Sequence, residues 1–167
     1  MKFKNPSSLH TTHIDTPLGG VRLAATDLGL AGLWFDDQQH SPDTTDWREN
    51  PSHPVLRQAA AQLQAYFAGE RNSFDLPLDL SHGTAFQQSV WQALLAIPRG
   101  ATTSYGALSE RVGRPAAVRA VGAAVGRNPI SVVVPCHRVL GADGGLTGYA
   151  GGLARKSALL TLEGALR

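Results

Sequence analysis

A single cysteine followed by a histidine is the part of this sequence best suited to chemistry. Cys136 and His137 stand in the segment 135–139, PCHRV, directly after the apolar run 132–134, which predicts a short buried strand. Proline fixes its own φ and restricts the residue before it, so Cys136 is presented on a stiff support, which suits a nucleophile. A lone cysteine after an apolar run is also typical of a small buried hydrophobe, and that interpretation stays open.

His137 and Glu163 are the candidates for moving the thiol proton. Neighbouring side chains of an extended segment point to opposite faces, so transfer from Cys136 to His137 needs a bridging water or a bend after Cys136. Glu163 lies near the end of a helix expected from about Leu153, where the helix dipole disfavours a negative charge. It is either an exposed acid at a frayed end or a buried carboxylate that orients His137, so that His137 accepts the proton and leaves a thiolate.

A glycine-rich segment lies between these residues. Six of the twelve positions in 141–152 are glycine. Asp143 and Gly144 form a turn signal, so a tight hairpin is one interpretation. The other is a pocket wall of bare backbone that approaches the edge of a flat ligand, with Tyr105 and Tyr149 supplying an aromatic surface and a hydroxyl donor.

The two halves of the chain differ in charge. Residues 1–80 carry a net charge of −4, whereas residues 81–167 carry +6, and eight of their nine basic residues are arginine. The planar guanidinium fork pairs with phosphate and stacks on bases. The second half therefore favours an anionic partner, and nucleic acid suits it better than a small phosphate ester.

Two short helices are expected in this basic half. They span about 104–112 and 115–125 and are separated by Gly113 and Arg114; Pro115 suits a first helical position, where an N–H has no partner. A short helix, a tight turn and a second helix form the outline of a helix-turn-helix.

The second of these helices has two distinct faces. Its apolar face, expected toward the core, consists of Val118, Val121 and Val125. Its opposite stripe consists of Arg119, Gly122, Ala123 and Gly126. Glycine in a helix interior costs about 1 kcal/mol relative to alanine, so the bare stripe needs a reason. Close packing against another helix is one possible reason for the small side chains. The other is close approach to a DNA groove that Arg119 enters, and the single cation on the stripe favours this second reason.

The first half predicts a small antiparallel sheet covered by one helix. Three short runs of β-forming and apolar residues are separated by turn signals: 10–16, 21–26 and 30–35. Residues 36–54 are expected to form a surface loop without chemistry, residues 55–68 a helix and residues 71–81 an extended connector. Beyond the connector, a capping box of Thr84 and Gln87 opens a helix that Pro98 stops.

Composition excludes several classes of protein. The chain has 167 residues and one cysteine, which rules out an internal disulfide and a cysteine-based zinc site. The histidines of the first half form no convincing metal site: His10, His13, His40 and His53. No apolar run approaches the roughly 18 residues of a membrane span, and residues 1–9 lack the apolar run of a secretory signal, so we expect a cytoplasmic protein.

Several motifs in order resemble one known family. The segments are RAVG at 119–122, NP at 128–129, PCHRV at 135–139, GYAGG at 148–152 and EG at 163–164. Together they closely resemble the DNA-repair alkyltransferases, the methylated-DNA:protein-cysteine methyltransferases, strongly over about 84–164 and by general architecture before that. The resemblance implies an α+β protein with a ribonuclease-H-like domain at 1–80 and a helix-turn-helix domain that carries the active site at 81–167.

The resemblance also implies a single-turnover reaction without cofactor or metal. Cys136 would take the alkyl group from the 6-oxygen of guanine in one displacement and keep it. Glu163, His137, a water and Cys136 would form the proton relay, and Tyr105 would help to neutralise the departing guanine. The sequence leaves open whether 4-O-methylthymine is also a substrate.

The implied partner is double-stranded DNA, bound in the minor groove by a protein that is monomeric in solution, with cooperative assembly on DNA left open. Arg119 would replace the flipped base, and Asn128 would tie the recognition helix to the active-site strand. Gly122 and Ala123 belong to the bare stripe that permits close approach. The base would be held by backbone groups and pocket-lining residues: Cys136, Val139, Ala150, Val125, Gly148 and Tyr149. Ala150 stands where some relatives have serine.

Two other classes of function compete with this one. A cysteine hydrolase or acyltransferase would use Cys136, His137 and Glu163 as a triad, but it leaves the basic half and the bare stripe unexplained. A non-catalytic DNA binder or lesion sensor leaves the reactive cysteine unexplained.

Overall fold

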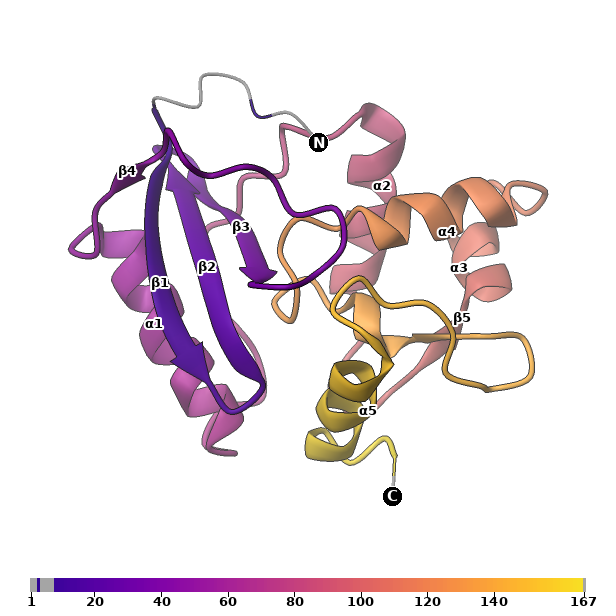
Figure 1. The fold of residues 1–167 in the computed structure, drawn as a ribbon. Coiled ribbons are helices and arrows are strands. Elements are labelled where there is room, and N and C mark those ends of the chain that lie inside the picture. Colours follow the sequence, from indigo (N-terminus) through magenta and orange to yellow (C-terminus); the bar gives the residue numbers. More distant parts are fainter. Residues whose placement is uncertain (1–2, 4–7, 167) are drawn as a thin grey trace. The chain divides into compact units, whose positions relative to one another are not determined.

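The computed structural model describes residue 3 and residues 8–166, which form two compact units (Figure 1). The first unit runs to His82 and also includes Pro129–Ser131; the second comprises Gly83–Asn128 and the chain from Val132 onward. The sequence placed a boundary at residue 80. It did not predict that Pro129–Ser131 belongs with the first unit.

The first unit is built on a four-stranded sheet. Strands β1 (His10–Thr16), β2 (Gly19–Thr26) and β3 (Gly29–Phe35) are antiparallel neighbours, as the sequence predicted, and the order is β3-β2-β1-β4. The expectation of a plain surface loop over 36–54 is wrong, because β4 (Arg48–Glu49) pairs parallel with β1. The segment is anchored there by Trp47, which is buried in an apolar cluster with Phe3 and Trp34.

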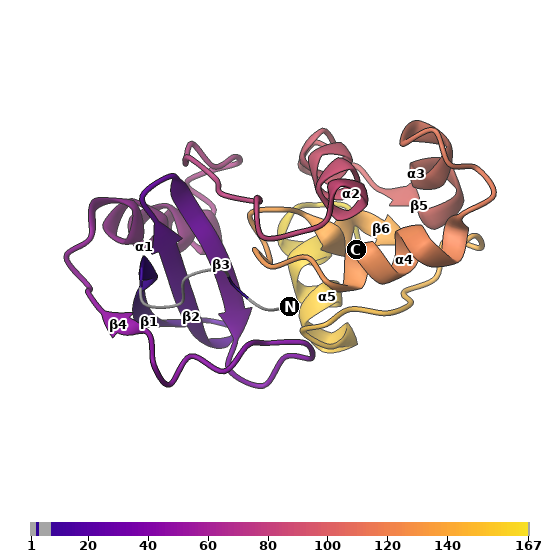
Figure 2. The same ribbon diagram turned by 90° about the horizontal axis from the view of Figure 1, so that it is seen from above.

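Helix α1 (Pro54–Phe67) covers one face of this sheet, as Figures 1 and 2 show. Residues at helical spacing face the strands and are buried: Leu56, Ala59, Leu63 and Tyr66. Pro54 begins the helix, and the His53 imidazole caps it by accepting a hydrogen bond from the Val55 N–H. The predicted helix is confirmed to within one residue at each end.

The free edge of β3 pairs with two segments from later in the chain. The Leu30 N–H donates to the Pro77 carbonyl at 2.8 Å, which places the predicted extended connector along this edge. Further along β3, the Leu33 N–H donates to the Pro129 carbonyl at 2.8 Å. Both segments are therefore held by backbone hydrogen bonds to the edge of β3, although neither segment is itself a regular strand.

The second unit is mostly helical. Helix α2 (Ala85–Leu95) opens with the predicted capping box, and the fully buried Trp91 donates its indole N–H to the Ala124 carbonyl at 2.8 Å. This bond ties α2 to α4 (Val118–Gly126), which follows α3 (Tyr105–Arg111). Strands β5 (Thr103–Ser104) and β6 (Val139–Leu140) pair in parallel, and α5 (Leu153–Leu162) ends the unit.

Helix α4 begins later than the sequence predicted. Pro115 lies in a turn rather than at the first helical position, and the N-cap Ala117 makes no side-chain cap. Val121 and Val125 are buried as expected, but Val118 is 40% exposed, so its assignment to the core is wrong. Because α4 starts at Val118, this valine stands at the first position of the helix and is not part of its buried face.

The expected strand over 132–134 is also wrong. Residues 131–133 form a turn, and Cys136–Arg138 form a single 3-10 turn, η2. The cause lies in the backbone, since Val132 has φ +72 and cannot continue an extended chain. Among the described residues, no helix is long and apolar enough to cross a membrane.

Candidate active site

Cys136 is presented by a bent backbone rather than by a strand. The Cys136 N–H donates to the Val134 carbonyl at 2.8 Å, and the Arg138 N–H donates to the Pro135 carbonyl at 3.0 Å. A β-branched residue with positive φ, such as Val132, costs of the order of 1–3 kcal/mol and persists only where its surroundings enforce it. The chain also bends after Cys136, in the 3-10 turn Cys136–Arg138, and such a bend is one of the two arrangements that the sequence offered for proton transfer to His137.

The sulfur of Cys136 is buried and hydrogen-bonded. The Asn128 side-chain amide donates to Sγ at 3.1 Å and to the Val134 carbonyl at 2.8 Å, so one residue at the end of α4 contacts both the sulfur and the backbone that presents it. Burial raises the pKa of the thiol to about 11, although Asn128, the charge of Lys156 and the backbone N–H act to lower it. At neutral pH the resting thiol is protonated, so reaction requires a base.

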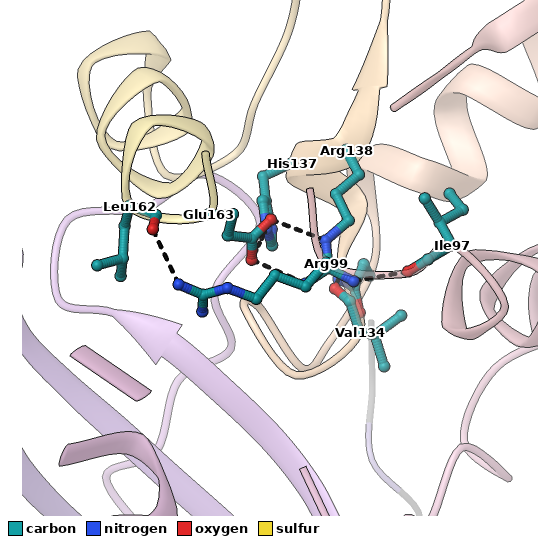
Figure 3. A network of polar contacts seen from close by, with 8 residues as sticks. Ile97, Arg99, Val134, His137, Arg138, Leu162 and Glu163 are labelled. Atoms are coloured by element: carbon teal, nitrogen blue, oxygen red, sulfur yellow. Dashed lines mark hydrogen bonds and ion pairs between the residues drawn. The ribbon is translucent and has the colours of Figure 1, made fainter. Parts of the chain in front are cut away.

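A buried carboxylate holds the imidazole of His137, the residue that follows Cys136 in the chain (Figure 3). His137 Nε2 lies 2.9 Å from Glu163 Oε2, and both side chains are excluded from solvent. Arg138 donates to the same carboxylate through Nε and Nη2, each at 2.8 Å. Glu163 is therefore neither exposed nor at a frayed end; the guanidinium balances its charge in a bidentate pair.

The imidazole of His137 is set up as a proton acceptor. Burial lowers the pKa of His137, and the hydrogen bond and charge of Glu163 offset only part of that effect. Because Nε2 faces a carboxylate, it carries the proton of the neutral ring. Nδ1 is buried and has no hydrogen-bond partner among the described residues, which leaves a lone pair available for a proton.

Two arginines fix the helix ends around this cluster. Arg138 Nη1 donates to the Ile97 carbonyl at 2.6 Å, just beyond the end of α2. Arg99 Nη2 donates to the Leu162 carbonyl at 2.9 Å, at the end of α5 (Figure 3). Cations that bind terminal carbonyls complement the negative end of a helix, so the carboxylate of Glu163 is stable there despite the unfavourable helix dipole.

An open hollow of about 630 Å³ lies beside α4. Its lining residues come from α3, α4 and the glycine-rich segment: Tyr105, Gly106, Val118, Arg119, Gly122, Ala142, Thr147 and Gly148. Four of these were predicted as site residues, namely Tyr105, Arg119, Gly122 and Gly148. Arg119 is exposed, and its guanidinium makes no hydrogen bond or ion pair within the described part of the chain, so it is available to a ligand.

Tyr105 lines this hollow and lies close enough to Cys136 for their charges to interact. Its hydroxyl donates to the Thr147 carbonyl at 3.3 Å, and its ring lies beside Gly122, where an added Cβ would stand 3.7 Å from Cδ1. Burial raises the pKa of Tyr105, and the charge of Cys136 raises it further. A neutral phenol in the lining of the hollow is a hydrogen-bond donor at neutral pH.

Other predicted site residues lie outside the lining of the hollow. Val125 and Val139 are buried, and Ala123 is exposed on α4. Tyr149 and Ala150 are partly buried in the glycine-rich segment, which ends where α5 begins. The lining of the hollow does not include Cys136, which is buried.

Arg138 and Lys156 were not predicted as site residues from the sequence. A signal for Lys156 was present: on a helix from Leu153, residues 156, 159, 160 and 163 share one face, so both Lys156 and Glu163 fall on the apolar stripe. Charges at buried positions of a helix need partners, which marks these two for attention. Within the described residues, no group of three or more histidine, cysteine or acidic side chains is placed to hold a metal ion.

Two family models match the chain and together span most of it. Residues 85–165 match the DNA binding domain of 6-O-methylguanine DNA methyltransferase, and residues 9–80 match the ribonuclease-like domain of the same family. The α+β fold and the cysteine-centred site thus define a protein of the DNA alkyltransferase class. The chain belongs to the 6-O-methylguanine DNA methyltransferase family.

Individual relatives agree with this assignment. Methylated-DNA--protein-cysteine methyltransferase of Mycolicibacterium paratuberculosis is 53% identical over 150 residues, which cover 90% of this chain and 89% of the relative. The protein of that name from Mycobacterium bovis is 51% identical over 93% of this chain and 92% of its own. A crystal structure of Mycobacterium tuberculosis OGT in complex with DNA superposes with a TM-score of 0.86 at 50% identity, covering 93% of each chain.

Replacing Glu163 with glutamine tests the buried ion cluster. The change keeps the size of the side chain but leaves the Arg138 guanidinium without its carboxylate in a buried site. We expect the free energy of unfolding to fall by about 3–5 kcal/mol, measured by urea denaturation. Glu110→Gln, at an exposed position of α3, is the matched control and should change stability by less than about 0.5 kcal/mol. Equal losses in the two variants would contradict this account of the cluster.

Proposed function

We propose that this protein repairs DNA by transferring a methyl or other alkyl group from the 6-oxygen of guanine to the sulfur of Cys136. The observation that carries the proposal is the buried sulfur itself: it is bonded to Asn128 and followed in the chain by a histidine whose free Nδ1 is backed by Glu163. Family membership supplies the reaction, and the geometry supports a role for each group in it.

The proton relay runs from the thiol to His137. A water accepts the thiol proton and passes one to Nδ1 of His137, while Glu163 stabilises the resulting imidazolium through Nε2. The thiolate attacks the alkyl carbon, so a carbon–sulfur bond forms as the carbon–oxygen bond breaks. Tyr105 donates its hydrogen bond to the departing guanine, which would otherwise leave as an anion. The thioether is not reversed, so each molecule acts once, without a cofactor.

Recognition of the damaged base is assigned to α3 and α4. We propose that they act as a helix-turn-helix in the minor groove of double-stranded DNA, where Gly122 and Ala123 allow close approach. Arg119 enters the duplex in place of the extruded nucleotide and offsets part of the few kcal/mol that extrusion costs. Asn128 links the end of α4 to the sulfur. The base itself is held by Val125, Val139, Gly148, Tyr149 and Ala150.

We assign a different role to each half of the chain. Residues 81–167 carry the DNA-binding and active-site domain, and residues 1–80 form the ribonuclease-like domain with its connector. We infer that the protein is monomeric in solution and that it works in the cytoplasm, in association with DNA.

Intact-protein mass spectrometry tests the transfer directly. After mixing with an excess of duplex containing 6-O-methylguanine, the protein should gain the mass of one methylene group, localised by peptide analysis to Cys136. Cys136→Ser should gain nothing. Repair should stop at one lesion per protein molecule, and clearance of a molar excess of lesion would point instead to a hydrolase with turnover.

Substituting Arg119 with alanine separates base extrusion from alkyl transfer. The transfer rate from duplex should fall by about tenfold or more, because nothing fills the gap left by the base, whereas the rate with free 6-O-methylguanine base should stay within about twofold of the unsubstituted protein. Arg111→Ala removes an exposed arginine of α3 as a matched control. If Arg119→Ala slows both substrates equally, Arg119 does not act through extrusion.

A further inference from the structure

Lys156 is a buried cation that the proposed reaction does not use. It lies on α5, its side chain is excluded from solvent, and it makes no ion pair within the described part of the chain. A buried ammonium without a counter-charge is costly, so its retention at this position needs a reason.

The three donors of the ammonium group go to three backbone carbonyls. Nζ lies 2.6 Å from the Val139 oxygen, 2.7 Å from the Thr147 oxygen and 3.2 Å from the Gly148 oxygen. Val139 directly follows the turn that carries Cys136, while Thr147 and Gly148 line the hollow. Lys156 therefore joins the active-site segment to the glycine-rich wall.

The same contacts reach Tyr105. Its hydroxyl donates to the Thr147 carbonyl that also accepts from Lys156, so the ammonium holds the oxygen against which the phenol is oriented. Since all three N–H donors are occupied, Lys156 has no hydrogen bond left for the sulfur. Its effect on Cys136 can only be that of a nearby charge.

Charges in the buried site are unequal before reaction. The carboxylate of Glu163 is balanced by Arg138, and His137 is neutral, which leaves the charge of Lys156 in excess. Transfer of the Cys136 proton to His137 leaves the net charge of the site unchanged, but it places a negative charge on the sulfur, which the charge of Lys156 stabilises. Consistent with this coupling, the charge of Lys156 lowers the pKa of Cys136, and the charge of Cys136 raises the pKa of Lys156 against the larger effect of burial.

We propose that Lys156 is a positioning residue for alkyl transfer: its ammonium ties Val139 to Thr147 and Gly148, and its unbalanced charge favours the thiolate of Cys136. The inference rests on the proposed function, in which that thiolate is the acceptor. Lys156 contacts neither the sulfur nor the substrate and acts through the groups it holds and through its field.

Reaction of the thiol with iodoacetamide at about pH 7.5 tests the charge effect without DNA, because the rate follows the fraction of thiolate. This pH lies below the range in which lysine loses its proton, so the charge of Lys156 is present during the measurement. Cys136 is the only cysteine, so the Cys136→Ser counterpart of each protein should not react. In Lys156→Gln, whose amide still donates hydrogen bonds but carries no charge, we expect an about tenfold slower reaction. Lys156→Arg keeps the charge and should react like the unsubstituted protein.

The sign of the change distinguishes charge from packing. If Lys156 only supports the fold, its loss loosens the site and admits both water and reagent, so Cys136 reacts faster. A reaction of Lys156→Gln that is unchanged or faster would overturn the proposal. Lys156→Met is measured alongside in case one neutral variant does not fold. Arg155→Met, which removes the neighbouring and partly exposed cation, should leave the rate unchanged.

Single-turnover kinetics connect the charge effect to the reaction. With saturating methylated duplex, Lys156→Gln should transfer the methyl group about tenfold more slowly than the unsubstituted protein, with an unchanged Kd for DNA, and Lys156→Arg should recover most of the rate. A raised Kd at an unchanged rate would count against the proposal. Should the unsubstituted protein take up no methyl group, the proposed function fails, whereas the rate of thiol alkylation by iodoacetamide still decides the role of the Lys156 charge.

Discussion

The buried carboxylate of Glu163, shared between His137 and Arg138, is the interaction on which the rest of the site depends. A single side chain at the end of α5 accepts from an imidazole and from a bidentate guanidinium, with every partner excluded from solvent or nearly so. The same guanidinium reaches the Ile97 carbonyl beyond α2. The ends of two helices and the turn that carries Cys136 are therefore held together by one ion cluster. Loss of either charged side chain of the Glu163–Arg138 pair would leave the other as an unpaired buried charge.

This arrangement solves a conflict between reactivity and burial. A small dry pocket is needed for a flipped base, but the same dryness raises the pKa of the thiol to about 11 and suppresses the nucleophile. Arg138 allows Glu163 to stay in the interior without drawing a proton onto His137, so the imidazole remains neutral and free to accept one. Asn128 and Lys156 then favour the thiolate once the proton has left. The reactivity arises when the proton moves, and a permanently ionised thiol is not required.

Much of this arrangement could be predicted from the sequence, and the failures have physical causes. The sheet and α1 follow from alternating and helical patterns, and the PCHRV segment marks Cys136 and His137. The strand expected at 132–134 did not form because Val132 adopts positive φ. This conformation depends on tertiary contacts, which a local sequence pattern does not predict. Lys156 went unassigned because a lysine is usually counted as exposed, although its spacing from Glu163 placed both on the buried face of α5.

The protonation of His137 is the most direct test of this account. Nitrogen-15 NMR of the histidine-labelled protein, with His137 assigned by comparison with His137→Gln, reports both its charge and its tautomer. We predict a neutral ring at pH 7 with the proton on Nε2, toward Glu163, and a pKa of His137 below the ordinary value of 6.5. A positively charged ring at pH 7, or a proton resident on Nδ1, would contradict the account, because His137 could not then receive the proton of Cys136.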